Sequence, residues 1–250
     1  MTINRTSHNQ YLLILAIIFA IEWLALAIKP YDRQDWLMEN ALVFIFVVIF
    51  ALTYKRFPFS RVSMTLIFIF LCLHEVGAHY TYSKVPYNIW TREIFGNSLN
   101  SIVGWERNNF DRLVHFLYGL LLSYPIREVF LRITNVRGFW GYFFPLDITM
   151  STSMIYELFE WAAAEIFGGD LGIAYLGIQG DVWDAHKDML LASIGAAMAM
   201  TITTAINIYL QNNFAREWAE SLKVKKHRPL GEDEIKRLWI KRKKGISRKD

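Results

Sequence analysis

A single cysteine, Cys72, is present among the 250 residues of the chain. An internal disulfide and a metal site built from several cysteines are therefore both excluded. The sequence also shows no internal repeat and no glycine-rich phosphate-binding pattern, so it does not support a nucleotide site. Cys72 lies in an apolar run, where we expect it to pack as a small hydrophobic side chain.

Hydrophobic residues make up 54% of the sequence and aromatic residues 16%, and the mean hydropathy is +0.21. This composition excludes an ordinary soluble domain with a single core. Apolar runs approach the roughly 20 residues that a helix needs to cross a bilayer at six places: residues 11–28, 38–54, 62–74, 111–131, 141–167 and 186–210. The sequence predicts an all-α polytopic membrane helix bundle with about six transmembrane helices over residues 1–212, followed by a basic cytoplasmic tail over 213–250.

The distribution of Lys and Arg predicts the orientation. Basic residues occupy the second and fourth connections and the C-terminal tail, whereas the fifth connection, residues 168–185, contains no Lys or Arg. The positive-inside rule then places the C-terminus in the cytoplasm. The longest connection, residues 80–110, also carries basic residues, which weakens the contrast. We expect the first run to be retained as a span, although a cleaved signal peptide is the alternative.

The tail interleaves Lys and Arg with Trp218 and Trp239. Such a segment beside a bilayer is expected to bind anionic lipids of the inner leaflet. The lipid bilayer is thus the expected partner, and no nucleic acid is expected.

The ionisable residues of the apolar runs form short patches, and the predicted orientation puts all of these patches near the extracytoplasmic face. A charge in hydrocarbon is unfavourable by several kcal/mol, so such residues usually face a bundle interior and serve a function there. The patches are His74, Glu75 and His79; Asp111 and His115; Glu157 and Glu160; and Asp181, Asp184, His186 and Asp188.

Spacings of three and four residues place the members of each patch on one helical face. Helix bundles hold divalent metals through such inward-facing carboxylate and histidine pairs. The sequence therefore predicts a divalent metal, which could be Mg, Mn, Fe or Zn, with ligands drawn from His74, Glu75, His79, Asp111, His115, Asp181, Asp184 and Asp188. Glu157 and Glu160 are the candidate catalytic acid or base.

Simpler interpretations compete with this one. Asp111 could serve equally well as a helix N-cap, and Asp147, which follows Pro145, is expected to be one. His115 could be a hydrogen-bonded core histidine, and the patches together could form a polar network that only holds helices together. The aromatic connection over residues 80–110 is expected to form an interfacial lid, with Arg92 and Arg107 able to meet an anionic headgroup or phosphate. The alternative is an aromatic belt that binds no ligand.

The chain resembles the YjdF-like family of bacterial inner-membrane proteins in the stretches HEVGAHYTY from His74, FDRLVHFLYG from Phe110, YELFEW from Tyr156 and GDVWDAHKDM from Gly180. That family has no established activity, so the resemblance implies membrane location and motif identity only. A weaker resemblance, to VanZ-like membrane proteins, rests on Asp111, Arg112, His115 and Phe116.

Three functions remain open from the sequence. The first is a membrane-embedded, metal-dependent hydrolase or transferase that acts on a lipid or lipid-linked substrate. The second is a transporter of ions or small solutes, which requires a polar path to the cytoplasmic side. The third is a structural membrane protein without catalysis.

Overall fold

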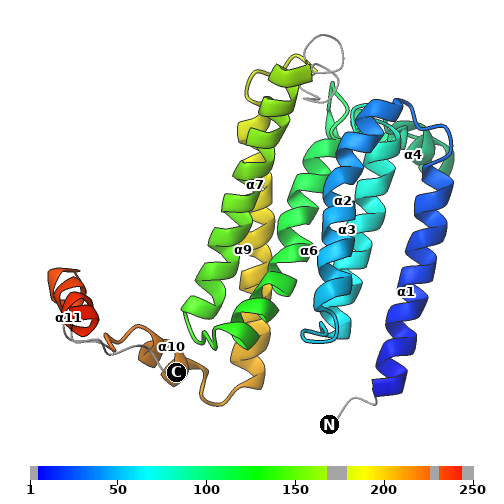
Figure 1. Ribbon diagram of the computed structural model, residues 1–250. Helices are drawn as coiled ribbons and strands as arrows, with labels where there is room; N and C mark the ends of the chain where they lie inside the picture. The colour runs from blue at the N-terminus through cyan, green and yellow to red at the C-terminus, as the bar shows by residue number, and fades with distance from the viewer. Residues whose placement is uncertain (1–4, 168–178, 226–230, 244–250) are drawn as a thin grey trace.

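The computed structural model of the chain describes residues 5–167, 179–225 and 231–243. Within these ranges every regular element is an α-helix, which confirms the predicted all-α class. Six long helices form a bundle (Figure 1): α1 (Arg5–Leu26), α2 (Arg33–Thr53), α3 (Arg61–His79), α6 (Phe110–Ile133), α7 (Trp140–Phe167) and α9 (Asp184–Leu210).

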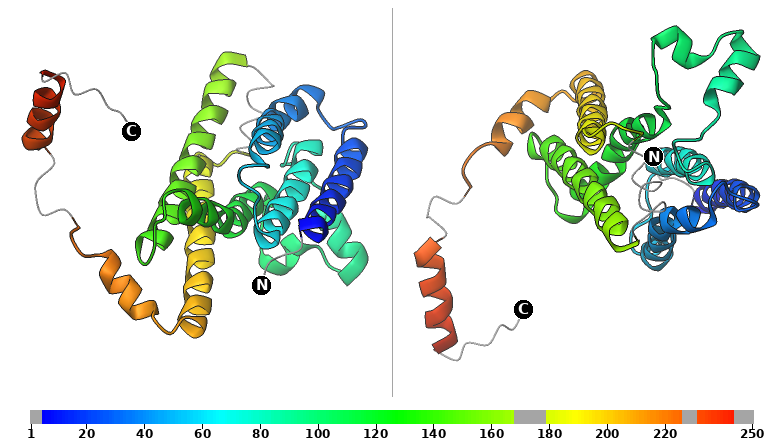
Figure 2. Two further views of the ribbon diagram at one scale, coloured as in Figure 1. Left: turned by 60° about the horizontal axis from the view of Figure 1, so that its bottom comes forward. Right: turned by 90° about the horizontal axis from the view of Figure 1, so that it is seen from above.

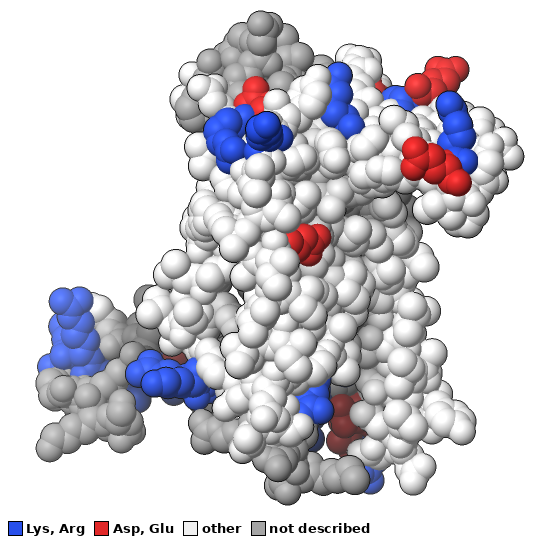
Figure 3. All heavy atoms as spheres, turned by 90° about the vertical axis from the view of Figure 1, so that its right-hand side faces the viewer, with Lys and Arg blue, Asp and Glu red and all other residues white. Residues whose placement is uncertain are grey.

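The surface of the bundle is that of a membrane protein. Among the described residues, α1, α2, α3 and α9 are long and apolar enough to cross a bilayer by length and composition. Helices α6 and α7 have 24 and 28 residues, but they carry more charged side chains, and four of the ten predicted site residues lie on them. In Figure 3 the Lys and Arg residues gather towards the two ends of the molecule, and the belt between them is almost free of charge.

The close approach of α6 to α9 organises the bundle. A Cβ atom added to Gly119 of α6 would overlap the backbone carbonyl oxygen of Ala192, and one added to Gly195 of α9 would overlap that of Phe116. Only glycine permits two helix backbones to meet in this way. Helix α3 packs on α6, α7 packs on both α6 and α9, and α1 and α2 pack on α3 (Figure 1).

We call the end where α3 and α7 finish and α6 and α9 begin the site end. The connection between α3 and α6 lies there and contains two short helices, α4 (Tyr87–Phe95) and α5 (Leu99–Val103), which extend sideways from the bundle (Figure 2). Part of this connection packs inward, because Tyr82, Val85 and Tyr87 form a buried cluster with Phe110 and Val114 of α6. It is therefore anchored to the bundle by its own apolar side chains.

The opposite end is tied together by polar contacts. Ser60, whose side chain accepts a hydrogen bond from the backbone N–H of Ser63, caps the N-terminus of α3. Glu128 of α6 accepts hydrogen bonds from the backbone N–H of Ser60 at 3.0 Å and from the Ser63 hydroxyl at 2.5 Å. These bonds join α3 to α6 at the end that the basic connections occupy.

The first part of the tail belongs to this same end. Helix α10 (Phe214–Ser221) packs its Trp218 ring against Phe139, with 5.4 Å between the ring centroids, and the Ser221 hydroxyl accepts a hydrogen bond from the backbone N–H of Phe139 at 3.0 Å. Helix α11 (Gly231–Lys243) follows it. The division of the chain at residue 212 stays a prediction.

The predicted cap of the fifth long helix was wrong. Helix α7 begins at Trp140 and continues through Pro145, so Asp147 lies inside the helix and is exposed. Pro145 is the sixth residue of α7, beyond the first turn in which a helix accepts proline without losing a hydrogen bond. The proline did not mark the start of the helix.

Candidate functional site

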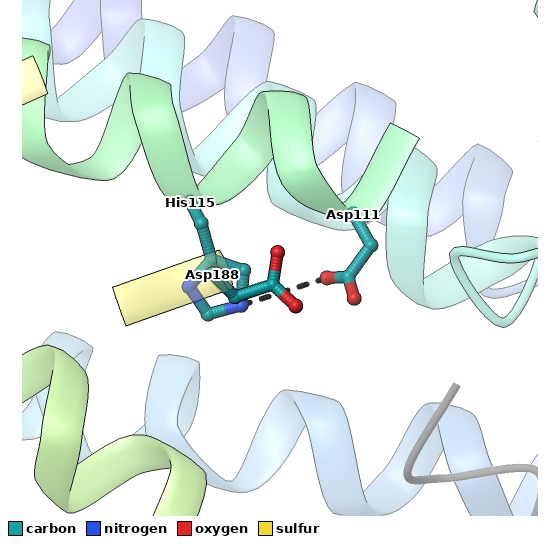
Figure 4. Close-up of side chains that lie close together, drawn as sticks. All are labelled: Asp111, His115 and Asp188. Atoms are coloured by element: carbon teal, nitrogen blue, oxygen red, sulfur yellow. Dashed lines mark ion pairs between the residues drawn. The ribbon is translucent and has the colours of Figure 1, made fainter. Parts of the chain in front are cut away.

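Three predicted ligands meet at the site end. Asp111 and His115 lie one turn apart at the start of α6, and Asp188 lies in the second turn of α9, facing them (Figure 4). Each offers one ligand atom, and these atoms all lie within 4.8 Å of one another. The glycine contacts between α6 and α9 begin immediately below these residues and hold the two helices close. The sequence pattern and the packing therefore converge on one cluster.

Glu157 of α7 joins this cluster. The Nε2 atom of His115 lies 3.6 Å from Asp111 Oδ1 and 3.5 Å from Glu157 Oε1. Both distances are longer than an ordinary N–H···O hydrogen bond. Two atoms that each ligate one ion at ~2.1 Å with a near-tetrahedral angle lie about 3.4 Å apart, which is close to the spacing between His115 and Asp111.

Asp188 has an unused ligand atom. Its side chain is 2% exposed, and Oδ1 is buried without a hydrogen-bond partner among the described residues. A buried carboxylate oxygen without a partner is strongly unfavourable. A cation bound by Asp111, His115 and Asp188 would remove this penalty.

A network of ion pairs stands beside the cluster. Both Nη atoms of Arg107 donate to the carboxylate of Asp184, at 2.6 and 3.0 Å, and Arg112 Nη2 donates to Asp181 and Asp184 at 2.5 and 3.0 Å. Asp184 is 3% exposed. This network ties the connection after α3 and the start of α6 to the start of α9. The oxygens of Asp181 and Asp184 are therefore already paired with the guanidinium groups of Arg107 and Arg112.

Asp181 lies before α9, outside the membrane-spanning segments. A hydrogen bond from Lys187, followed by bonds from the Trp183 backbone and from Arg112, lowers the pKa of Asp181 from 3.8 to about 2. Its contribution to stability is therefore complete above the ordinary pKa and is lost as the pH falls through about 2. The carboxylate is charged at physiological pH.

His74 borders the cluster without a free ring nitrogen. Its Nε2 atom donates to the backbone carbonyl of Glu39 at 3.3 Å, and its Nδ1 atom accepts from the hydroxyl of Tyr82 at 2.5 Å. His74, Tyr82, Asp111 and His115 all line one cavity between α2, α3, α6 and α7. Because both of its ring nitrogens are engaged, His74 does not offer a ligand atom in this arrangement.

Glu75 and His79 lie near other helices. His79 Nδ1 donates to the carbonyl of Leu26 at the end of α1, at 2.7 Å. Glu75 is fully buried and lies near Asn40 and Glu22. These two residues are not part of the cluster around His115, and their predicted role as ligands stays a prediction.

Glu160 lines a second cavity, of about 350 Å³, together with Glu157, His186 and Asp188. This cavity lies between α7 and α9. The two predicted catalytic glutamates are therefore one turn apart, next to the cluster. Their predicted role also stays a prediction.

The structure differs from what the sequence led us to expect for Asp111 and Arg107. Helix α6 begins at Phe110, with Asn109 in the N-cap position, so Asp111 lies within its first turn and is not the N-cap. Arg107, which was expected to meet an anionic headgroup, pairs with Asp184. The sequence could not reveal this pair because 77 residues separate its members.

The sequence interpretation missed Glu39 of α2. Its side chain is 4% exposed and accepts a hydrogen bond from the hydroxyl of Tyr156 at 3.0 Å. The Tyr156 ring in turn lies edge-on to His115, with 5.9 Å between the centroids. The sequence did contain a signal for Glu39, because Asp35 and Glu39 are four residues apart at the start of the second apolar run.

These features define an integral membrane helix bundle with a buried cluster of acids and histidine near one end. The sequence family described as "Predicted membrane protein (DUF2238)" matches residues 11–208. The chain belongs to this family, which confirms the predicted kinship.

One relative is the "Inner membrane protein YjdF" of Escherichia coli strain K12, which is 36% identical over 170 residues, covering 68% of this chain and 77% of the relative. No solved structure matches the chain significantly. The family and this relative together support a multi-pass protein of the bacterial inner membrane. Neither description assigns an activity.

Proposed function

We propose that the protein is a metal-dependent hydrolase or transferase that acts on a lipid or lipid-linked substrate. The observation that carries the proposal is the meeting of Asp111, His115 and Asp188, whose ligand atoms lie within 4.8 Å of one another. Three protein ligands leave a coordination position open for water or substrate, as in catalytic metal sites. The proposed ion would activate water or polarise a phosphoryl or acyl oxygen.

The balance of charge supports a cation. Asp111, Glu157 and Asp188 approach one another around the imidazole of His115, while Arg107 and Arg112 already pair with Asp181 and Asp184. Carboxylates in a low dielectric repel one another unless protons or a cation neutralise them. A divalent ion supplies two positive charges at the centre of the group.

Glu157 is the group best placed to move a proton. It is 9% exposed, and its Oε1 atom has no hydrogen-bond partner among the described residues. From α7 its Oε1 atom comes within 3.5 Å of His115 Nε2. It could take a proton from water held at the open coordination position and return it to a leaving group, with Glu160 one turn away.

The test begins with metal content. We expect about one divalent ion per chain in protein purified in detergent without chelator. His115→Ala should reduce this content to the background level because a first ligand is lost. The matched control is His79→Ala, which removes a histidine that bonds to the Leu26 carbonyl and should leave the content unchanged.

The second measurement tests catalysis. We expect Glu157→Gln to retain the metal but to lose about 10²-fold or more of the lipid conversion that mass spectrometry detects after incubation with a bacterial lipid extract. A folded wild-type protein that binds no divalent ion would refute the metal centre. A Glu157→Gln variant that converts lipid as fast as the wild type would refute the role of Glu157.

A transporter remains the alternative. It needs polar groups that continue across the membrane from the cluster. Beyond His115 the adjoining cavity is lined mainly by apolar residues such as Ile67, Phe70 and Leu122. This apolar lining favours an enzyme.

We also propose that the site end faces away from the cytoplasm and that the tail lies against anionic lipids of the inner leaflet. The connections at the opposite end support this orientation, because Lys55 and Arg56 lie between α2 and α3 and Arg137 lies between α6 and α7. Since Cys72 is the only native cysteine, a Cys72→Ala background permits a direct test.

In this background Asn97→Cys, between α4 and α5, should react with a membrane-impermeant maleimide in intact spheroplasts. Arg137→Cys, in the connection after α6, should react only after lysis. Both positions are exposed, so equal labelling from outside, or the reverse pattern, would contradict the orientation.

A further inference from the structure

A cavity of about 290 Å³ lies between α2, α3, α6 and α7. The helices contribute, among others, Phe46 of α2, Ile67 and Phe70 of α3, Leu122 of α6 and Phe159 of α7. Taking ~30 Å³ for each group of the size of a water molecule, the cavity has room for about ten methylene groups. This space suits one hydrocarbon chain.

The polarity of the cavity changes along its length. On α6 the lining residues are Asp111, Val114, His115, Tyr118 and Leu122, a spacing that places them on one helical face. From Asp111 to Leu122 the helix rises about 16 Å, which is close to half of the ~30 Å hydrocarbon core of a bilayer. The cavity therefore has a polar end at Asp111 and His115. Its deeper part is mostly apolar, with the hydroxyls of Tyr118, Thr152 and Ser153 on its walls.

The cavity opens towards the surface between α2 and α7. On its rim Leu42 of α2 is 44% exposed, and Ile155 and Phe159 of α7 are 42% and 59% exposed. Helix α2 packs on α3, whereas α7 packs on α6 and α9, so the two rim helices belong to different sides of the bundle. Their exposed faces are apolar and would lie against lipid.

A hydrogen bond spans the opening at its polar end. The hydroxyl of Tyr156 on α7 donates to Glu39 on α2 at 3.0 Å. A molecule that enters between the two helices must therefore pass on the membrane side of this bond. The bilayer itself supplies apolar chains at that depth.

From this geometry we infer that the cavity binds one hydrocarbon chain of a membrane lipid, which enters sideways from the bilayer between α2 and α7. The placement of the lipid's polar group at Asp111, His115 and Asp188 rests on the proposed function; the binding of the chain does not. A polar solute would lose most of its hydration against these walls, where a few hydroxyls such as that of Ser153 offer little replacement, whereas a lipid chain exchanges one apolar environment for another. The substrate class is thus an amphiphile with a chain long enough to fill about one leaflet.

The probe is tetradecyl phosphate carrying a diazirine at the far end of its chain, added to proteoliposomes that contain the full chain. After irradiation, peptide mass spectrometry locates the covalent adducts. We expect adducts on the deep walls of the cavity, at Phe46, Phe70 or Leu122, in addition to those on the lipid-facing surface of α1. Excess unlabelled tetradecyl phosphate should suppress the cavity adducts, because a site saturates and a bulk surface does not.

A variant that fills the cavity can be compared with a variant that carries the same ring outside it. Ser153→Phe places a ring in the cavity from α7, where Ser153 is 2% exposed, and should lower the yield of cavity adducts about tenfold. Met150→Phe introduces the same ring at an exposed position of α7, where Met150 is 44% exposed, and should leave this yield unchanged. The adducts on α1 should remain constant in all variants. Val43→Phe, which fills the cavity from α2, replaces Ser153→Phe if that variant does not fold.

Two results would overturn the inference. One is a wild-type protein whose cavity walls carry no adduct, and the other is a cavity yield that a folded filling variant does not change. Repeating the experiment with EDTA separates the chain site from the metal centre. Cavity adducts in a protein that binds no metal would refute the proposed function alone, and bound metal without cavity adducts would refute the chain site alone.

Discussion

Gly119→Ala is expected to remove most of the folded protein. A Cβ atom at this position would lie well inside van der Waals contact with the backbone carbonyl oxygen of Ala192. Neither backbone can rotate away as a side chain can, so α6 and α9 must separate along their whole contact. We expect a loss of more than about 3 kcal/mol of stability, beyond the usual range for overpacked cores. Fluorescence-detected gel filtration and thermal unfolding in detergent measure this loss.

Gly141→Ala is the matched control on α7. There the added Cβ atom would meet Leu131 Cδ2 at 3.5 Å, which is an ordinary contact, and alanine favours the helix by up to about 1 kcal/mol. We expect this variant to elute and unfold like the wild type or slightly better. Equal behaviour of the two alanine variants would show that α6 and α9 are not in close contact at Gly119.

The second large effect is expected for Asp184→Ala. This change removes the carboxylate that accepts two hydrogen bonds from Arg107 and one from Arg112. Both guanidinium groups are largely shielded from water, with side-chain exposures of 16% and 20%. Removal of one partner from a buried ion pair destabilises a protein by about 3–5 kcal/mol. Thermal unfolding should show the loss, and hydrogen exchange should increase in the connection that contains Arg107.

The control for this prediction is Arg237→Ala in α11. Arg237 and Glu234 form an ion pair at 2.6 Å, but their side chains are 61% and 37% exposed. Exposed pairs of this kind contribute about 0.3–0.5 kcal/mol. If Asp184→Ala is no more destabilising than Arg237→Ala, the network around Asp184 does not hold the site end together.

Much of the architecture could be predicted from the sequence because each long helix carries its own signal. Length and apolar composition revealed the membrane helices, and the spacing of Asp111 and His115 placed both on one face. The basic second and fourth connections, together with a fifth connection that lacks Lys and Arg, placed the patches at one end. These signals are local, and the structure brings Asp111, His115 and Asp188 together as the pattern indicated.

The grouping of the patches could not be predicted in the same way. Helical spacing shows which residues share a face, but not how that face is rotated towards its neighbours. Neighbouring residues of α3 therefore diverge: His74 borders the cavity, whereas His79 bonds to the end of α1. The pairing of Arg107 with Asp184 depends on the path of a long connection, about which the local pattern contains no information.

The glycine contact between α6 and α9 has a consequence for regulation. Asp111, His115 and Asp188 stand on two backbones that cannot slide past each other, whereas Glu157 stands on α7, whose contacts include side chains that can adjust. A small tilt of α7 would therefore move Glu157 away from His115 while Asp111, His115 and Asp188 keep their spacing. Under the proposed function, a change in membrane thickness or tension would then alter activity without releasing the ion.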